Sequence, residues 1–289
     1  MNQLPTSDGP DLAPISRGAL RSARRLTSRR GRQEAGAFLV EGAQAVAEAL
    51  AHAPRVRLLA TREPGRDADL LARARQRDVP VVGLDDRDVA ALSETVTSQG
   101  LFAVCDQVAV EGLPASPSRL VVICCQVRDP GNAGTVIRCA DAFGADAVVL
   151  TRGSVDPHNP KTVRASVGSL FHLPVHTGVE ADRAVAWARE GGLQVLAADG
   201  HGSPLDLLGH SGGLDGPTAW LMGNEAWGLP EPVRSLADLS VAVPMWGRAE
   251  SLNLSTAAAI CLYASASAQR RTQGRQSGGR EPWTTASLD

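Results

Sequence analysis

Aromatic residues are scarce in this sequence of 289 residues: they make up 3% of it, with five Trp, four Phe and one Tyr. Proteins that bind single-stranded nucleic acid through stacked rings need several exposed aromatic side chains on one surface. The composition therefore argues against a broad aromatic platform. Hydrophobic residues make up 43% of the chain, which predicts a globular protein with a real core and one large or two medium domains.

Cysteine is also sparse. The five cysteines form no Cys-x-x-Cys pair, and their number is odd. A disulfide framework is therefore not expected. Neither His158 nor His172 has a Cys or His partner at ligand spacing, so we also expect no metal site. Cys124 and Cys125 lie inside an apolar run and are expected to be buried.

Membrane and export signals are missing as well. The sequence has no charged segment followed by an apolar one at its start, and no apolar run of membrane-spanning length. We therefore expect a cytoplasmic protein that does not engage a membrane.

The two common phosphate-binding fingerprints do not occur. No segment reads G-x-x-x-x-G-K-[ST], and Lys161 is the only lysine of the chain. The turn at residues 128–138 lacks the pattern G-x-G-x-x-G. The sequence therefore does not predict a P-loop or the usual dinucleotide-binding turn.

Charge is nearly balanced overall, with a formal net charge of -2, but the segment from Ser16 to Gln33 is strongly basic and has no acidic residue. Such a block either contacts phosphates or forms a solvated basic tail. Its arginines are Arg17, Arg21, Arg24, Arg25, Arg29, Arg30 and Arg32.

The alternation of apolar runs with turn residues predicts two α/β domains, residues 15–108 and 120–267. Residues 109–119 are rich in Pro and Ser and are expected to be a linker. The end segments, 1–14 and 268–289, lack periodicity and are expected to be disordered tails. Expected strands are 37–40, 56–60, 79–83, 101–108, 120–125, 147–150, 194–198, 219–222 and 240–243. Expected helices include one that starts at Ser16 and others at 43–51, 67–77, 88–94, 133–143 and 254–266.

The first segment that carries chemistry follows the strand expected at 120–125. Pro130 and Gly131 break that strand and a helix begins after them, so unpaired N–H groups there can hold an anionic group. Asn132 is either a helix cap or a functional residue, and Arg138 projects from a neighbouring turn of the helix. Taken alone, this segment favours the purely structural interpretation.

Two further segments follow later strands. Residues 221–230 (LMGNEAWGLP) carry two glycines near a strand end, which suggests a main chain that a ligand approaches closely. An ordinary strand-to-helix turn is the alternative. In residues 243–255 (VPMWGRAESLNLS), either Ser251 or Asn253 is placed to cap the last helix.

Together the three segments resemble the SpoU/TrmH branch of the SPOUT methyltransferases, with the patterns N-x5-R, hydrophobic-G-N-E-x-x-G-L and V-P-M-x-G-x-x-x-S-L-N-x-S in the family's order. Residues 36–42 and 95–100 resemble the RNA substrate-binding domain that often precedes the catalytic one. The resemblance implies a small N-terminal α/β substrate-binding domain and a C-terminal SPOUT α/β domain with a trefoil knot. Nothing in the spacing of the sequence itself indicates the knot.

The same resemblance implies transfer of a methyl group from S-adenosylmethionine to a ribose 2′-hydroxyl of structured RNA. Arg138 corresponds to the family's catalytic arginine, and Asn132, Glu225 and Asn253 to its supporting polar residues. Because a guanidinium stays protonated, Arg138 is expected to bind phosphate and stabilise an alkoxide rather than to act as a base. The positions implied for cofactor binding are Leu221, Met222, Gly223, Asn224, Gly228, Val243, Pro244, Met245, Ser251, Leu252 and Leu254.

The resemblance also implies a homodimer with the active site at its interface, and it favours RNA contact for part of the basic surface. The residues expected to bind RNA are Arg24, Arg25, Arg30, Arg32, Lys161 and Arg164. The extra N-terminal domain favours 23S ribosomal RNA as the substrate, by analogy. A tRNA 2′-O-methyltransferase, and a non-catalytic RNA-binding or ribosome-assembly factor on the same fold, are the alternatives.

Overall fold

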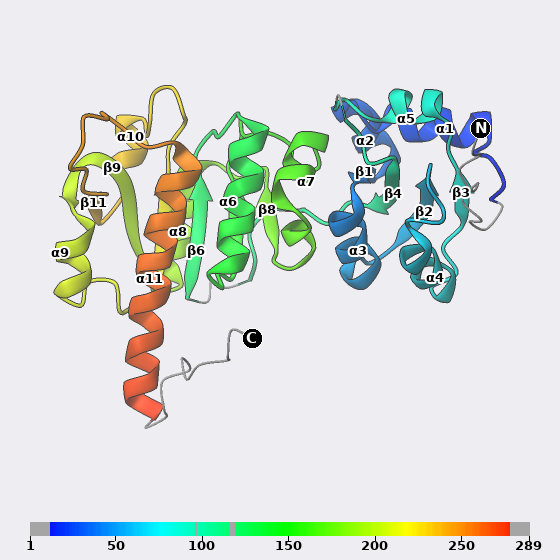
Figure 1. Cartoon of the computed structure of the whole chain (residues 1–289). Coiled ribbons are helices and arrows are strands. Elements are labelled where there is room, and N and C mark those ends of the chain that lie inside the picture. The colour runs from blue at the N-terminus through cyan, green and yellow to red at the C-terminus, as the bar shows by residue number, and fades with distance from the viewer. Residues whose placement is uncertain (1–11, 96, 116–118, 278–289) are drawn as a thin grey trace. The chain divides into compact units, whose positions relative to one another are not determined.

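Two β-sheets organise the protein in the computed structural model, which describes residues 12–95, 97–115 and 119–277 (Figure 1). Each sheet forms the centre of one compact unit. Of the described residues, those up to Val110, Arg128–Arg138 and Val155–Val175 form unit 1. Unit 2 contains those in Glu111–Val127 and Cys139–Ser154 and those from His176 to Ser277.

The sheet of unit 1 has four strands in the order β1-β4-β2-β3. Strand β4 is antiparallel to β1 and β2, whereas β2 and β3 are parallel. These strands are β1 (Ala37–Glu41), β2 (Val56–Thr61), β3 (Val81–Gly83) and β4 (Leu101–Asp106). The helices of unit 1 are α1 (Arg17–Arg25), α2 (Arg29–Ala35), α3 (Ala43–His52), α4 (Ala68–Gln76), α5 (Asp86–Leu92), α7 (Pro160–Ser166) and the 3-10 helix η1 (Ser169–Phe171).

The basic segment forms two short helices, where the sequence predicted one. Ser16 caps α1 by accepting a hydrogen bond from the N–H of Ala19 at 3.2 Å, as expected. Ser28 then caps a second helix, α2, by accepting from the N–H of Gly31 at 3.1 Å. Because each serine satisfies a free N–H at a helix start, the segment is an ordered part of unit 1 and not a tail.

The sheet of unit 2 has seven strands in the order β11-β9-β10-β6-β7-β8-β5. The neighbours from β11 to β7 are all parallel. The strands are β5 (Val110–Glu111), β6 (Leu120–Cys124), β7 (Ala147–Leu150), β8 (Val175–Thr177), β9 (Gln194–Pro204), β10 (Thr218–Met222) and β11 (Leu239–Ala242). The remaining helices are α6 (Pro130–Ala142), α8 (Ala181–Glu190), α9 (Leu205–His210), α10 (Glu231–Arg234) and α11 (Leu254–Ser277).

Helices cover both faces of the sheet of unit 2. Leu221 of β10 packs in a core cluster with Val185 and Ala188 of α8. The next residue toward the N-terminus, Trp220, is fully buried and donates from Nε1 to the Ser265 hydroxyl of α11 at 3.0 Å. Because successive side chains of a strand point to opposite faces, α8 and α11 cover opposite sides. The predicted α/β class with a buried parallel sheet is confirmed.

Two predicted boundaries need correction. Within the predicted tail 1–14, Ala13 accepts a hydrogen bond from the N–H of Gly83 at 2.9 Å, so the chain is ordered from Leu12. Helix α11 continues to Ser277 instead of ending near residue 266, and Gln269, 4% exposed, donates to the Gly216 carbonyl at 2.8 Å. Residues 1–11, 116–118 and 278–289 of the predicted tails and linker lie outside the described part.

The compact units also differ from the predicted domains. Val110 and Glu111 of the predicted linker form the short edge strand β5. The start of α6 and all of α7 belong to unit 1, although the sequence suggested the second domain. A Cβ at Gly134 of α6 would lie only 2.6 Å from the Cβ of Ala165 in α7, so these helices pack backbone to backbone. Such packing between distant segments leaves no trace in local periodicity.

A buried ion pair joins α2 to the segment before α7. Arg32 is 2% exposed, and its guanidinium contacts Asp156 at 2.7 Å while donating to the carbonyls of Leu26 and Thr27. Burial alone would raise the pKa of Asp156, but its hydrogen bonds with His158 and its pairing with Arg32 outweigh burial and lower that pKa. The RNA contact predicted for Arg32 is therefore wrong, because this side chain is enclosed by the protein.

We predict that Arg32→Ala lowers the free energy of unfolding by about 3–5 kcal/mol, because it leaves the carboxylate of Asp156 buried without its cation. Urea unfolding at neutral pH measures this change. Because the pKa of Asp156 is lowered in the folded state, its stabilisation is present above about pH 4 and is lost as the pH falls below that value.

The matched control is Arg30→Ala. Arg30 has a side chain that is 90% exposed and pairs with Glu34 on the surface, so its removal should cost less than about 0.5 kcal/mol. Equal losses in the two variants would contradict the role assigned to the buried pair.

Candidate active site

The second motif forms a closed turn at the carboxyl end of β10. Asn224 and Gly228 exchange two main-chain hydrogen bonds, each of 2.9 Å. A Cβ on residue 223 would lie 2.4 Å from the carbonyl carbon of Gly228 and 2.6 Å from the nitrogen of Leu229. Gly223 is therefore required because its own loop folds back against it, and not only for the ligand approach that the sequence suggested.

The side chain of Asn224 holds this turn in place. It is 6% exposed, accepts from the N–H of Ala226 at 2.8 Å and donates from Nδ2 to the carbonyl of Gln126 at 2.7 Å. Gln126 follows strand β6, so the amide joins the ends of two neighbouring parallel strands. Asn224 is thus a positioning residue, whereas Glu225 lies on the exposed part of the turn.

The third motif begins at the end of β11. Strands β10, β9 and β11 are mutually parallel, so the second and third motifs lie at the same edge of the sheet, with β9 between their strands. Val243 and Pro244 are partly buried, whereas Met245 is 38% and Trp246 90% exposed. The main chain from Met245 to Leu252 belongs to no helix or strand.

Asn253, and not Ser251, caps the last helix. Its Oδ1 accepts from the N–H of Ser255 at 2.9 Å and from the hydroxyl of Ser255 at 2.6 Å. Ser251 is exposed, Leu252 is partly buried, and Leu254 is the first residue of α11. The motif S-L-N-x-S therefore fixes where the loop ends and the helix begins.

Asp129 caps helix α6, whereas the sequence suggested Asn132 for this role. The Oδ1 atom of Asp129 accepts from the N–H of Asn132 at 2.8 Å, and Pro130 is the first helical residue. This hydrogen bond is the main reason that the pKa of Asp129 is lowered. The dipeptide Asp-Pro is a common helix start, so the sequence held this signal. Arg138 lies exposed on the same helix.

Two of the residues predicted to bind RNA face carboxylates. Lys161 Nζ lies 3.2 Å from Asp129 Oδ2, with both side chains about half exposed at 55% and 42%. Arg164 donates to Glu41 Oε2 at 3.0 Å, and Glu41 is 10% exposed. Arg164 therefore neutralises an enclosed carboxylate and serves the fold of unit 1, whereas Lys161 remains accessible.

The two motifs of the N-terminal unit meet at Glu41, a contact that the sequence did not reveal. Its Oε1 atom accepts from the hydroxyls of Ser93, Thr95 and Ser98 at 2.7, 3.2 and 2.8 Å. In addition, the side chain of Gln99 accepts from the N–H of Ala43 at the start of α3. The segments 36–42 and 95–100, which carry the family resemblance, thus take part in one hydrogen-bond network that supports the fold.

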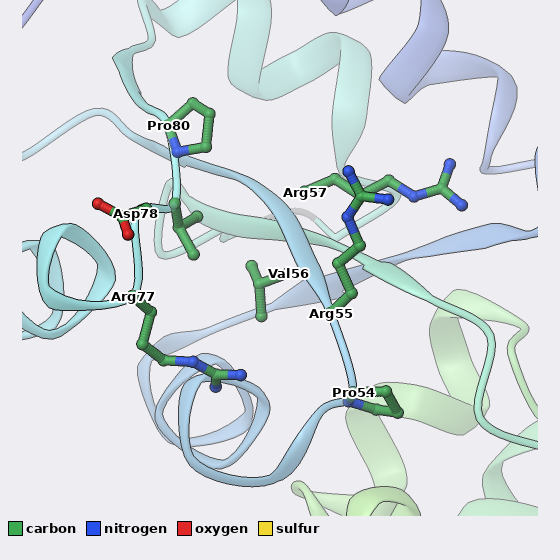
Figure 2. A pocket seen from close by; sticks show the side chains of 8 residues that line it. Pro54, Arg55, Val56, Arg57, Arg77, Asp78 and Pro80 are labelled. Carbon is green, nitrogen blue, oxygen red and sulfur yellow. The ribbon is translucent and has the colours of Figure 1, made fainter.

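A separate pocket of about 340 Å³ opens in unit 1 (Figure 2). It is lined by Pro54–Arg57 and Arg77–Pro80, none of which belongs to the three motifs. Arg57 pairs with Asp106, and Arg77 donates to main-chain carbonyls of Leu50 and Ala53. Two of its three arginines therefore support the fold, and the pocket is not a candidate cofactor site.

Buried thiols near the strand ends are not candidate nucleophiles. Burial raises the pKa of Cys125, directly after β6, to about 12, and it raises the pKa of the neighbouring Cys124 as well. A thiol must ionise to attack, so both cysteines are inert core residues.

Comparison with protein families matches both parts of the chain. Residues 119–263 match the model of the SpoU rRNA Methylase family, and residues 19–103 match the MRM3-like substrate binding domain. The chain belongs to the SpoU rRNA methylase family. The resemblance found in the three motifs and in the N-terminal segments is thereby confirmed.

Two 23S rRNA methyltransferases align with most of this SpoU family member. The 23S rRNA (guanosine(2553)-2'-O)-methyltransferase RlmP of Bacillus subtilis is 34% identical over 241 residues, covering 83% of this chain and 92% of the relative. The 23S rRNA (uridine(2479)-2'-O)-methyltransferase of Streptomyces viridochromogenes is 32% identical over 265 residues, covering 86% and 88%.

The fold agrees with that of a solved SpoU structure. AviRb from Streptomyces viridochromogenes in complex with the cofactor AdoMet superposes with a TM-score of 0.73 at 29% identity, covering 92% of this chain and 100% of that chain. Among the described residues, we find no helix with both the length and the apolar character needed to cross a lipid bilayer.

We predict that Gly223→Ala lowers the free energy of unfolding by about 1–3 kcal/mol, because the added Cβ forces the turn away from Gly228. Gly247→Ala in the third motif is the control, since a Cβ there meets nothing within 4 Å. It should change stability by less than about 1 kcal/mol. Urea unfolding of both variants tests the assignment, and an undisturbed Gly223→Ala protein would contradict it.

Proposed function

We propose that this protein transfers a methyl group from S-adenosylmethionine to a ribose 2′-hydroxyl in 23S ribosomal RNA. One observation carries the proposal: the parallel strands β10 and β11 end at one sheet edge in the two motif loops, in a chain that belongs to the SpoU family. Ligands of parallel α/β sheets commonly bind at the carboxyl ends of the strands.

The residues of unit 2 fit this cofactor. The loop from Met245 to Leu252 belongs to no helix or strand, and partly buried apolar side chains, Val243 and Leu252, lie at its two ends. The three segments that would hold the cofactor are residues 221–228, 243–245 and 251–254. Bound there, S-adenosylmethionine supplies a methyl group on a sulfonium centre. Asn224 and Asn253 act as positioning residues, because each fixes the shape of one loop.

Arg138 is the residue that we assign to the ribose. Its guanidinium stays protonated, so it cannot accept the proton of the 2′-hydroxyl. It binds the phosphate next to the target ribose and stabilises the negative charge that develops on the oxygen. A water molecule or the phosphate takes the proton. Asn132 and Glu225 are assigned as polar groups that orient the RNA.

Basic residues on the surface of unit 1 contribute the RNA contacts. Arg25, Arg30 and Lys161 have side chains that are 63%, 90% and 55% exposed, and Arg24 is exposed as well. Their surface carboxylate partners can be exchanged for phosphates at small cost, because exposed ion pairs are weak. These four residues therefore remain in the proposed RNA surface.

We also propose that the protein is a homodimer. Unit 2 exposes several large apolar side chains around the third motif and on α11: Met245, Trp246, Ile260 and Tyr263. Trp246 is 90% and Tyr263 61% exposed. Aromatic residues and Met are enriched in the buried centres of protein interfaces. A second copy that covers them would also shape the active site. Because the proposed substrate is ribosomal RNA, we expect the enzyme in the cytoplasm.

We predict that Arg138→Ala lowers turnover on 23S rRNA by about 10²–10³-fold, because the developing oxyanion loses its cation. Transfer of a labelled methyl group, followed by nucleoside analysis for 2′-O-methylation, measures the effect. Arg138→Lys should retain part of the activity, since a lysine keeps the charge but not the paired donors. The control is Arg183→Ala, an exposed arginine of α8.

Undiminished transfer by Arg138→Ala would contradict the mechanism. Calorimetry with S-adenosylhomocysteine separates the alternatives: RNA binding without cofactor binding would favour the non-catalytic assembly factor. Preferential methylation of tRNA under the same conditions would favour the tRNA enzyme.

A combined Trp246→Asp and Tyr263→Asp variant should dissociate the dimer, because two charges would be buried in its interface. Sedimentation velocity measures the change of mass. Leu207→Asp is the control, since Leu207 of α9 is 63% exposed but outside the third motif and α11. A wild-type protein that sediments as a monomer would contradict the proposed dimer.

A further inference from the structure

Three side chains that commonly bind metals converge in unit 1, outside all the motifs. Glu48 and His52 lie on α3, and His172 follows η1, more than a hundred residues later. One ligand atom from each residue lies within 4.8 Å of the others. The proposed methyl transfer gives none of these residues a role.

Two of the three separations suit a tetrahedral ion. His172 Nε2 lies 3.1 Å from Glu48 Oε2, and His52 Nε2 lies 3.5 Å from the same oxygen. Zinc bonds of about 2.0–2.1 Å at tetrahedral angles place two ligand atoms about 3.4 Å apart. Both separations are therefore close to the spacing of two ligand atoms around a tetrahedral zinc ion. Small adjustments of three side chains would complete the set.

The fold pre-arranges these groups. Glu48 and His52 are four residues apart on a helix, so both project from the same face. The rings of His52 and His172 meet edge to face with centroids 5.0 Å apart. Gly168, with a φ of +96°, leaves room for the side chain of Glu48, since a Cβ there would lie 2.4 Å from the Glu48 Cγ.

The group is also accessible. The side chains of Glu48, His52 and His172 are 31%, 52% and 30% exposed, so an ion can enter and a water molecule can complete its coordination. Two imidazoles and one carboxylate are donors that suit zinc, whereas calcium and magnesium prefer oxygen donors alone.

We propose that Glu48, His52 and His172 form a zinc site that ties α3 to the segment after η1. The ion stabilises unit 1 and takes no part in methyl transfer. The sequence predicted no metal site, because no Cys or His lies at ligand spacing from His172. The partners of His172 come from a helix far away in the chain, which spacing alone does not reveal.

Isothermal titration of the full, untagged and metal-free chain with zinc chloride tests the site. We expect one zinc ion per chain, and affinity at least about tenfold weaker in His52→Ala and in His172→Ala. Zinc should raise the Tm of the wild type more than that of either variant. His201→Ala is the matched control, because His201 Nδ1 lies 3.3 Å from one carboxylate, Asp199, but belongs to no such triad among the residues that the structure describes.

Glu48→Gln provides a second variant that preserves the shape of the group while removing its charge, and it should also weaken binding. No zinc binding to the wild type would overturn the proposal. Binding of the same strength in His52→Ala and His172→Ala would do so as well. Because the readouts are zinc affinity and Tm, failure here leaves the proposed methyl transfer untouched.

Discussion

At the carboxyl end of β10 the main chain turns back on itself so closely that residue 223 has to be a glycine. A side chain there would collide with Gly228 and Leu229. Asn224 then locks the turn to the end of β6 through Gln126. The shape of the proposed cofactor loop depends on this closed turn. Main-chain hydrogen bonds between Asn224 and Gly228 hold residues 223–228 in place. Backbone-built sites of this kind are rigid without needing bulky side chains.

The charged residues of unit 1 divide into two groups with different tasks. Arg32 and Arg164 are withdrawn from solvent and balance Asp156 and Glu41. A buried charge must be paired, because its desolvation is otherwise strongly unfavourable. Arg25 and Arg30 stay in water and pair only weakly. Burial therefore decides which arginines of the basic segment are available to phosphate.

Much of the fold could be predicted from the sequence, because local patterns determine local structure. The strands expected at 120–125 and 147–150 formed as β6 (Leu120–Cys124) and β7 (Ala147–Leu150), and Ser16 capped the expected helix. The end of α11 was placed too early because Gln269 is polar, yet the fold buries it. Polar residues that are buried by distant partners escape pattern analysis.

The candidate site was predictable where its motifs specify main-chain shape, and less so where side chains meet. The sequence identified Gly223 and Asn253 as special, and both make contacts that shape their loops. It assigned Arg32 to RNA because this residue lies in a basic segment, and its partner Asp156, 124 residues away, leaves no sign in the local sequence. The trefoil knot and the homodimer remain predictions.

The most direct test of the central claim is a map of 2′-O-methylation across ribosomal RNA and tRNA from cells with and without the gene. The account predicts that deletion removes a ribose methyl group from 23S rRNA, and that wild-type protein restores it. Methylation that is unchanged in all ribosomal RNA, or a loss confined to tRNA, would contradict the account.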